Sequence, residues 1–221
     1  MEEKSKKNPE IGSYIDHTLL KPDATREQVK KLCMEALEYN FCSVCVNSSR
    51  VPDAAGLLKG SPVKVCAVVG FPLGAMDSSA KGFEAAAAIA AGASEIDMVI
   101  NIGALKEGDH DFVENDIKTV RKSCGKGIIL KVIIETCLLT DEEKKAACRI
   151  ALKAGADFVK TSTGFSTGGA TEDDVRLMKN EVGDKAKVKA SGGVRSYDDA
   201  VKMINAGASR LGTSSGIAII T

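Results

Sequence analysis

Short apolar runs rich in Val and Ile recur along the chain, and helical patterns lie between them. This alternation predicts strands that are each followed by a helix, which is the arrangement of a parallel sheet. Strands of such a sheet are covered on both faces, so they read as nearly continuous apolar runs. The runs predicted as strands are Tyr14–Thr18, Phe41–Val46, Val63–Val69, Glu95–Ile100, Ile128–Glu135, Asp157–Thr161, Lys187–Ser191 and Ser209–Gly212.

The segments between these runs carry start signals for helices. In a capping box, two side chains three positions apart satisfy the free amides of a first helical turn. Such pairs are Thr25 with Gln28, Thr140 with Glu143, Thr171 with Asp174, and Ser196 with Asp199. The helix predicted after Thr25 has one apolar face that packs on the sheet, and its members are Val29, Leu32, Cys33, Ala36 and Leu37.

A short Ala-Gly-Ala repeat relates three of these units, at Ala91–Asp97, Ala154–Lys160 and Ala206–Gly212. In each copy the glycine is expected to end a helix in the left-handed conformation, with a strand soon after it. The last residue of each copy should then have the same height in the sheet and the same face. Asp97 and Lys160 are therefore predicted at equivalent positions on different strands.

Eight βα units without a linker or a composition shift favour a closed (β/α)8 TIM barrel over an open doubly wound sheet. We expect one compact α/β domain over residues 11–221, after a polar extension of residues 1–10. The last helix should be short, because only six residues follow Ser215.

Charge and hydropathy exclude several classes of partner. Lys+Arg and Asp+Glu are both 30, so there is no basic field for nucleic acid, and 4% aromatic residues provide no stacking platform for single strands. The longest apolar run, 85–91, is far shorter than the roughly 20 residues that span a bilayer. The first ten residues are charged and do not resemble a signal peptide. A cytoplasmic protein with no membrane partner is expected.

The seven cysteines are an odd number and lie in apolar segments, which indicates reduced, mostly buried thiols. We interpret Cys42 and Cys45 as small apolar residues of a strand rather than as a redox or zinc pair. With only two histidines, His17 and His110, a histidine-based metal site is difficult to assemble. No metal or cofactor is expected, and His17 is interpreted as a hydrogen-bonded core residue, with metal ligation as the alternative.

Four ionisable residues interrupt consecutive predicted strands: Asp97, Lys131, Lys160 and Lys189. One such lysine could simply reach solvent from a strand end. Four together predict a cluster at the mouth of the barrel. Neighbouring ammonium groups and burial lower the pKa of a lysine, and a neutral lysine can attack a carbonyl to form a Schiff base. Asp97 is then the natural proton shuttle.

Glycine-rich loops follow the last two predicted strands, at 191–195 and 212–216. These are the positions at which barrels commonly bind phosphate through loop amides. Thr163 and Gly164 could add amides, and Arg195 could add a charge. Each loop taken alone would more often be an ordinary turn, but the two loops together favour phosphate binding.

Taken together, these strings resemble the deoxyribose-phosphate aldolase family of class I aldolases. The similarity runs from about Ile11 to Ser215 and is carried by Ile15–Pro22, Glu95–Asp97, Lys131–Thr136, Val159–Gly164, Lys189–Arg195 and Gly212–Ser215. The resemblance implies a metal-free lyase of deoxyribonucleotide catabolism. It would cleave 2-deoxy-D-ribose 5-phosphate reversibly to D-glyceraldehyde 3-phosphate and acetaldehyde.

The resemblance also implies residue roles. Lys160 would form the Schiff base, Lys189 would perturb its pKa, and Asp97 would transfer protons with water. Asp16 and Lys131 would line the pocket. Substrate binding, mainly of the phosphate, would involve Thr163, Gly164, Gly192, Gly193, Arg195, Gly212, Ser214 and Ser215. A homodimer is expected by the same analogy.

Two features depart from the family. Phe165 stands where some members have a lysine near the phosphate, and the chain ends without the tyrosine that some members use in proton transfer. Two alternatives therefore stay open: a Schiff-base aldolase for another phosphorylated sugar, and a catalytically silent phosphosugar-binding protein.

Overall fold

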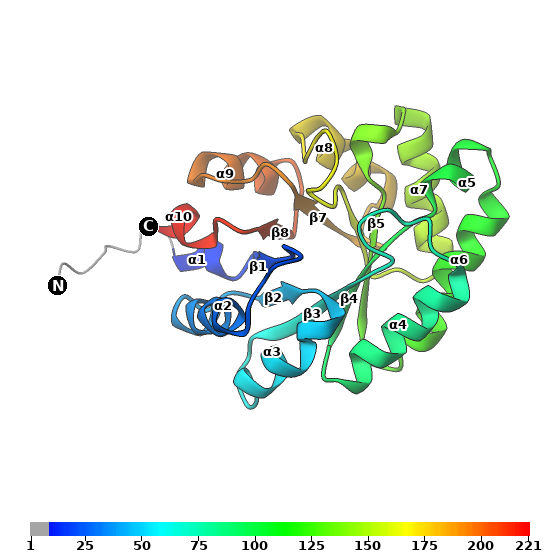
Figure 1. The fold of residues 1–221 in the computed structure, drawn as a ribbon. Coiled ribbons are helices and arrows are strands. Elements are labelled where there is room, and N and C mark those ends of the chain that lie inside the picture. The colour runs from blue at the N-terminus through cyan, green and yellow to red at the C-terminus, as the bar shows by residue number, and fades with distance from the viewer. Residues whose placement is uncertain (1–8) are drawn as a thin grey trace.

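The computed structural model describes residues 9–221, and within them eight parallel strands form a closed barrel in sequence order (Figure 1). Each strand pairs with the next, and β8 closes the barrel on β1. The strands are β1 (Ile15–Leu19), β2 (Ser43–Val46), β3 (Lys64–Val69), β4 (Glu95–Val99), β5 (Ile129–Ile133), β6 (Phe158–Lys160), β7 (Lys187–Ser191) and β8 (Arg210–Thr213). The predicted TIM barrel is confirmed, and each predicted strand overlaps an observed one.

Helices surround the barrel, as Figure 1 shows. They are α1 (Pro9–Gly12), α2 (Arg26–Glu38), α3 (Val51–Leu57), α4 (Ser78–Ala90), α5 (Ile102–Lys106), α6 (His110–Ser123), α7 (Asp141–Lys153), α8 (Glu172–Val182), α9 (Tyr197–Asn205) and α10 (Gly216–Ile220), with 3-10 turns η1 (Ser48–Arg50) and η2 (Thr136–Leu138). The last helix has five residues, as predicted. Most of the predicted extension lies outside the described residues, but its last two residues begin α1, which contacts α10.

Capping boxes start three helices as predicted, at Thr25, Thr140 and Ser196. The fourth prediction is half wrong. The Thr171 side chain accepts from the amide of Asp174, but no reciprocal bond forms. The carboxylate of Asp174 instead lies 2.6 Å from Nζ of Lys144 on the neighbouring helix α7, and this ion pair replaces the second half of the box.

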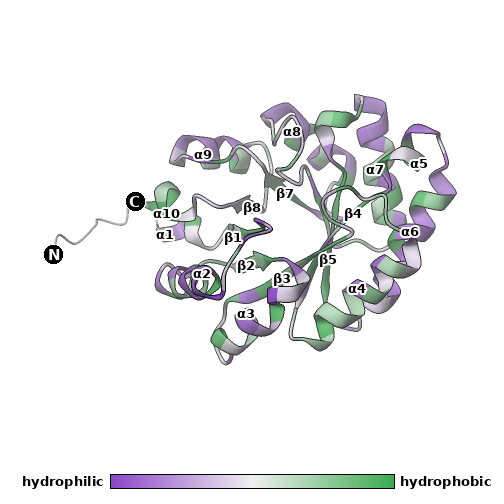
Figure 2. Ribbon diagram, in the orientation of Figure 1, coloured by the Kyte–Doolittle hydropathy of each residue, from purple (hydrophilic) through white to green (hydrophobic). Residues whose placement is uncertain are grey.

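The two faces of the strands have opposite character. In β4, Ile96 and Met98 belong to the apolar core between strands and helices, whereas the alternating Glu95 and Asp97 face the barrel interior. Figure 2 shows hydrophobic residues along much of the strands and along parts of the helices, and hydrophilic residues on helix segments that lie away from the barrel. The interior is therefore the polar compartment of this fold.

No helix within residues 9–221 is long and apolar enough to cross a membrane. All seven cysteines are free thiols, and five of them are buried, which confirms the prediction of mostly buried thiols. The three repeat glycines have positive φ as predicted, 113° at Gly92, 86° at Gly155 and 113° at Gly207.

Candidate active site

The strand register stacks the inward side chains in layers. In a barrel, the inward side chains at one level come from alternate strands. Because the strands tilt, the residue at a given level lies about one position further along the chain than the hydrogen-bonded partner, for each strand crossed. Asp97 pairs with Lys131, and Lys131 pairs with Phe158, so the β6 residue level with Asp97 is Lys160. The same register places Gly212 at this level on β8. The predicted equivalence of the last repeat residues is confirmed.

Three such layers fill the barrel from its carboxyl-terminal end downward. The upper layer is Cys45, Asp97, Lys160 and Gly212; the middle layer is Asp16, Cys66, Lys131 and Lys189; the lower layer is Ser43, Glu95, Phe158 and Arg210. A typical barrel of this class fills these positions with branched apolar side chains. Here they contain three carboxylates and four cationic groups, nearly all fully buried.

Asp97 is the centre of the charged cluster. Its Oδ1 accepts a hydrogen bond from Nζ of Lys131 at 2.7 Å. Its Oδ2 accepts from Nζ of Lys160 at 2.7 Å and from Nζ of Lys189 at 2.8 Å. Lys189 also lies 2.5 Å from Oδ2 of Asp16. The four charged strand residues therefore converge as the sequence predicted, but Asp97, Lys131 and Lys189 are fully buried inside the barrel and do not lie at its mouth.

Sequence reasoning missed the lower half of this network. Glu95 lies 2.7 Å from Nζ of Lys131 and 2.9 Å from Nη2 of Arg210, which also donates to Asp16. Both Glu95 and Arg210 were placed in predicted strands without a role. Glu95 is two positions before Asp97, so the period of two in a strand puts it on the same inward face. That period was the signal that could have found it.

The carboxylates decide the ionisation of the buried lysines. Burial by itself would lower the pKa values of Lys131 and Lys189, but Asp97 and Asp16 outweigh it and raise both above their ordinary value. Burial would likewise raise the pKa of Asp97, yet the ammonium groups of Lys131, Lys160 and Lys189 hold it well below its usual range. The idea that clustered ammonium groups depress a lysine pKa is therefore wrong for Lys131 and Lys189, since carboxylates lie closer. Both remain charged at neutral pH.

A cavity of about 290 Å³ opens above the upper layer, at the carboxyl ends of β1, β6, β7 and β8. Lys160, which is 3% exposed, is the one charged member of the three layers that lines it. Asp97 and Lys189 are fully buried behind Lys160. Asp16 and Lys131, expected to line the pocket, are also fully buried and lie one layer lower, because the alternate-strand layering places them beneath Asp97 and Lys160.

The structure brings the predicted loop residues together on the wall of this cavity. They are Thr163, Gly164, Gly192, Gly193, Arg195, Gly212, Ser214 and Ser215. Gly212 has a steric reason for its identity, because a Cβ there would lie 2.2 Å from Oγ of Ser191 and 3.1 Å from Cε of Lys189. Sequence reasoning assigned no role to four polar lining residues: Thr18, Lys21, Ser191 and Thr213. The buried hydroxyl of Ser191 has no hydrogen-bond partner within residues 9–221.

Not every loop amide is available to a ligand. The amide of Thr163 donates to Glu135, that of Phe165 to Oγ1 of Thr163, and that of Ser215 to Oγ1 of Thr213. Of the pair Thr163 and Gly164, only Gly164 retains a free amide among the described contacts. Its φ of 83°, like the φ of 81° at Gly192 and at Gly193, is a conformation that glycine adopts without strain.

Glu135 fixes the geometry of the loop after β6. Glu135 itself follows β5, which ends at Ile133, two residues before the predicted end. Its backbone is left-handed, with φ 56° and ψ 66°. Its buried carboxylate accepts from Oγ1 of Thr163 at 2.5 Å and from the Thr163 amide at 3.3 Å. A strained conformation of this kind persists only where neighbouring contacts enforce it.

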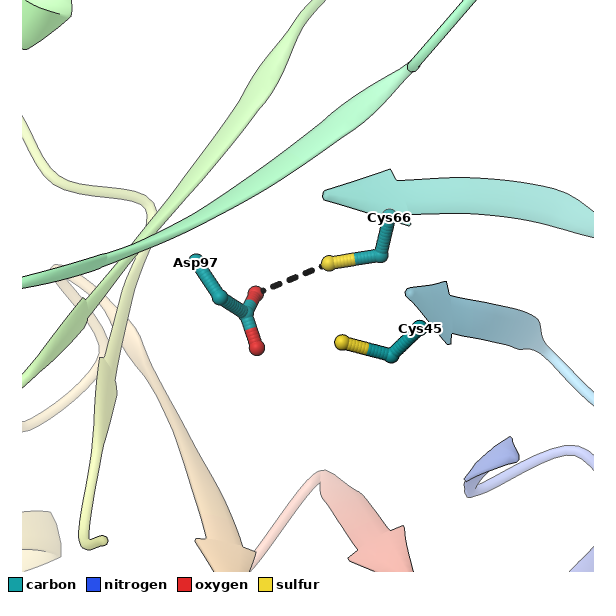
Figure 3. Close-up of side chains that lie close together, drawn as sticks. All are labelled: Cys45, Cys66 and Asp97. Carbon is teal, nitrogen blue, oxygen red and sulfur yellow. Dashed lines mark hydrogen bonds between the residues drawn. The ribbon is translucent and has the colours of Figure 1, made fainter. Parts of the chain in front are cut away.

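Two thiols lie against the catalytic candidate Asp97, as Figure 3 shows. The sulfurs of Cys45 and Cys66 and a carboxylate oxygen of Asp97 are within 4.8 Å of one another, and Cys66 donates to Asp97 at 3.1 Å. Burial and these neighbours hold the pKa of Cys66 well above its ordinary value, so it is a neutral thiol. A cation placed among these groups would face the three ammonium groups that already contact Asp97. Cys45 thus neighbours Cys66 and not Cys42 of the C-x-x-C.

His17 is a buried residue in the middle of β1, not at a strand end. Its Nε2 is 2.8 Å from Oε2 of Glu35 on α2, and its ring contacts Phe41 edge-on at 5.1 Å between centroids. The interpretation of His17 as a hydrogen-bonded core residue is confirmed.

Comparison with known proteins adds the following similarities. The family profile described as DeoC/LacD family aldolase matches residues 12–221. A Clostridium kluyveri protein named deoxyribose-phosphate aldolase is 64% identical over 211 residues, covering 96% of this chain and 97% of the relative. One of the same name from Carboxydothermus hydrogenoformans is 62% identical, covering 95% and 93%. A tetrameric deoxyribose phosphate aldolase from Aeropyrum pernix has a similar structure, with TM-score 0.90, 36% identity, and 96% and 91% coverage.

Proposed function

This chain belongs to the DeoC/LacD family of aldolases, and from that membership we propose that it cleaves 2-deoxy-D-ribose 5-phosphate reversibly to D-glyceraldehyde 3-phosphate and acetaldehyde. The observation that carries the proposal is the position of Lys160. This amine alone connects the buried charge network to the cavity, and it shares one oxygen of Asp97 with Lys189.

The proposed reaction uses Lys160 as its neutral amine, which is the nucleophilic form of a lysine. The three layers hold four cationic groups and three carboxylates, so one proton can leave the network while each carboxylate still has a cation to face. Lys131 and Lys189 retain theirs, because Asp16 and Asp97 raise their pKa values. Lys160 is the remaining lysine, and its amine faces the cavity from which a substrate enters.

The first half of the reaction forms the Schiff base. Neutral Nζ of Lys160 attacks C1 of the open-chain aldehyde, and a proton then passes from the attacking nitrogen to the resulting alkoxide, which gives a neutral carbinolamine. Asp97, acting with a water molecule, supports transfer of a second proton to that hydroxyl. The hydroxyl leaves as water, and the nitrogen lone pair forms the iminium. Lys189, which shares Oδ2 of Asp97 with Lys160, keeps its positive charge throughout.

The second half cleaves the carbon–carbon bond. A base reached through water removes the C3 hydroxyl proton, the new carbonyl forms at C3, and the C2–C3 bonding electrons pass to the iminium. Glyceraldehyde 3-phosphate leaves, and an enamine remains on Lys160. Protonation at C2 gives the iminium of acetaldehyde, and water hydrolyses it to release acetaldehyde and regenerate the amine.

The substrate phosphate is proposed to bind at the rim of the same cavity. Backbone amides of Gly164, Gly193 and Ser214 would donate to it, with Arg195 as a charge partner. Asp16 and Lys131 would act from the layer beneath, by holding Lys189 and Asp97 in place. No cofactor or metal takes part in this proposal.

Reductive trapping tests the central step. Incubation with 2-deoxyribose 5-phosphate and sodium borohydride, followed by intact-mass analysis and peptide mapping, should give a reduced adduct on Lys160. Omission of borohydride should give none, since the imine hydrolyses. An adduct on another lysine, or none in protein shown to be folded by circular dichroism, would overturn the assignment of Lys160.

A substitution series complements the trapping. Lys160→Leu should reduce turnover to the uncatalysed background and leave the circular dichroism spectrum unchanged. Release of other aldehydes across a panel of sugar phosphates would identify an aldolase for a different sugar. Binding of the panel without chemical change would instead identify a phosphosugar-binding protein.

The assembly and compartment are part of the same proposal. We expect a homodimer, which sedimentation velocity would distinguish from a monomer or a tetramer. We also expect a cytoplasmic enzyme, because its free thiols suit a reducing compartment.

A further inference from the structure

The wall of the cavity carries three cationic side chains, of Lys21, Lys160 and Arg195. Lys160 is engaged with Asp97. The side chains of Lys21 and Arg195 form no ion pair or hydrogen bond with another residue in the range 9–221. A phosphate monoester carries nearly two negative charges at neutral pH. Arg195 alone would leave one of them uncompensated, and Phe165, 52% exposed on the neighbouring loop, offers no charge.

Lys21 stands on an anchored turn. The amide of Ala24 donates to the carbonyl of Lys21 at 3.2 Å, which closes a turn with Pro22 at its second position, where the fixed φ of proline is favourable. Nη2 of Arg50 donates to the carbonyl of Ala24 at 2.7 Å. Nδ2 of Asn47 donates to the carbonyl of Leu20 at 3.2 Å. The backbone that carries Lys21 is therefore held from two sides.

The barrel topology sets the direction from which Lys21 approaches. β8 pairs with β7 on one side and with β1 on the other. The loop after β8, which contains Ser214, therefore lies between the loop that carries Arg195 and the loop that carries Lys21. An anion on the amides of the β8 loop would have one cation available on each flank.

From this arrangement we infer that Lys21 is a specificity-determining residue that binds the substrate phosphate from the β1 side, opposite Arg195. The inference rests on the proposed function. Lys21 supplies the second positive charge on a wall where Phe165 supplies none. It selects phosphorylated over unphosphorylated sugars and takes no part in the bond-breaking step at Lys160.

Kinetics on a matched pair of substrates tests this role. The variants are Lys21→Met, which keeps the length but removes the charge, and Lys21→Arg, which keeps the charge. Lys59→Met is the matched control, because Lys59 is also exposed but does not line the cavity. Each protein is assayed with 2-deoxyribose 5-phosphate and with 2-deoxyribose.

Lys21→Met should lower kcat/KM for the phosphorylated sugar by about tenfold, as expected for loss of one charge-assisted contact, chiefly through KM. Its kcat/KM for 2-deoxyribose should equal that of the unmodified enzyme. Lys21→Arg should restore most of the loss, and Lys59→Met should change neither substrate.

Equal losses on both substrates, or no loss on either, would overturn the inference while leaving the aldolase assignment intact. Failure of the proposed function has a different signature. In that case the unmodified protein would turn over neither sugar and would give no borohydride adduct on Lys160. Because this result concerns the unmodified protein, it is independent of what the Lys21 variants do.

Discussion

Fully buried lysine–aspartate pairs lie in two different regions of this molecule. Lys81 of α4 contacts Asp116 of α6 at 2.6 Å and the carbonyl of Val99 at 3.0 Å, in the layer between barrel and helices. Lys131 contacts Asp97 at 2.7 Å inside the barrel. Among the described residues, the only other polar side-chain contact of the helix-layer pair is the hydrogen bond that Ser78 donates to Asp116. The barrel pair continues through shared oxygens to Lys160 and the cavity. Connection to a cavity, rather than burial, distinguishes the functional pair.

The two environments also shift lysine pKa values in opposite directions. Burial lowers the pKa of Lys81, and the single carboxylate of Asp116 offsets this only in part. Burial would lower the pKa of Lys131 as well, but Asp97, Glu95 and Asp16 outweigh it, and the pKa is raised. The number of nearby carboxylates decides the sign. An interior rich in carboxylates therefore keeps the supporting lysines Lys131 and Lys189 charged, while Lys160, which lines the cavity, is the lysine proposed to react.

Asp97→Asn should break the barrel network with the largest effect. Three ammonium groups would lose their shared anion, and the free energy of unfolding should fall by about 3–5 kcal/mol. Turnover should fall by about 10²–10⁴-fold, because the proton shuttle is also lost. Urea unfolding followed by circular dichroism and a coupled aldehyde assay would measure both. Loss of stability with full activity would contradict the role of Asp97.

The same variant changes the response to acid. The pKa of Asp97 is lowered in the folded state, so its stabilisation is complete above its unfolded pKa of about 3.9 and is lost as pH falls through the folded value. Stability should therefore decline below about pH 4, and Asp97→Asn should flatten that decline. An unchanged acid limb in Asp97→Asn would show that other carboxyl groups set it.

Lys81→Met tests the helix-layer pair by separating stability from activity. It removes the hydrogen bonds that Nζ of Lys81 donates to Asp116 and to the carbonyl of Val99, and both buried acceptors lose their donor, so the free energy of unfolding should fall by about 3–5 kcal/mol. The double variant Lys81→Met/Asp116→Leu should recover most of this loss, because neither charge remains. Activity at 25 °C should be unchanged in both, and a change in kcat would contradict the separation of the two regions.

The alkaline limb gives a second readout for Lys81. Its folded pKa lies below the unfolded value of 10.5, so the cost of burying its charge disappears as pH rises from the folded to the unfolded value. The unmodified protein should gain stability relative to Lys81→Met in that interval. Lys131 and Lys189 contribute the opposite slope only above about pH 10.4, since their folded pKa values are raised.

Glu135→Gly should have a smaller effect, confined to the rim of the cavity. Glycine relieves the left-handed strain at this position, so stability should change little. The loop after β6 loses the acceptor of Thr163, so KM for the phosphorylated sugar should rise severalfold while kcat changes less. Glu135→Gln retains an acceptor and should keep a KM near that of the unmodified enzyme. Equal kinetics for Gly and Gln variants would contradict a positioning role.

The outer half of the fold was predictable because each strand has an apolar outward face and each helix has local start signals. Each capping box joins an N-cap residue to the residue three positions later, as at Thr25, Thr140 and Ser196. These helix starts can therefore be predicted without knowledge of tertiary contacts. Where a distant partner competes, the local rule fails, as for Asp174 with Lys144.

The inner half was predictable in position but not in electrostatics. Asp97, Lys131, Lys160 and Lys189 were visible as charges in apolar strands, and the repeat gave their level. The sign of their pKa shifts depends on contacts of 2.5–2.8 Å between residues as distant in sequence as Lys189 and Asp16. The register of a closed barrel creates those contacts, and no local pattern encodes them.

Thr140→Ala provides the smallest expected effect and the baseline for the outer region. It removes the acceptor for the amide of Glu143 and half of the capping box of α7, so the free energy of unfolding should fall by about 1 kcal/mol. Helix α7 packs against α6 and α8 outside the barrel, so kcat and KM should be unchanged. Thr140→Ser keeps the hydroxyl and should restore stability, which separates the cap from side-chain volume. A shift in KM would instead show that strain in the helix layer reaches the loop after β5, where Glu135 lies.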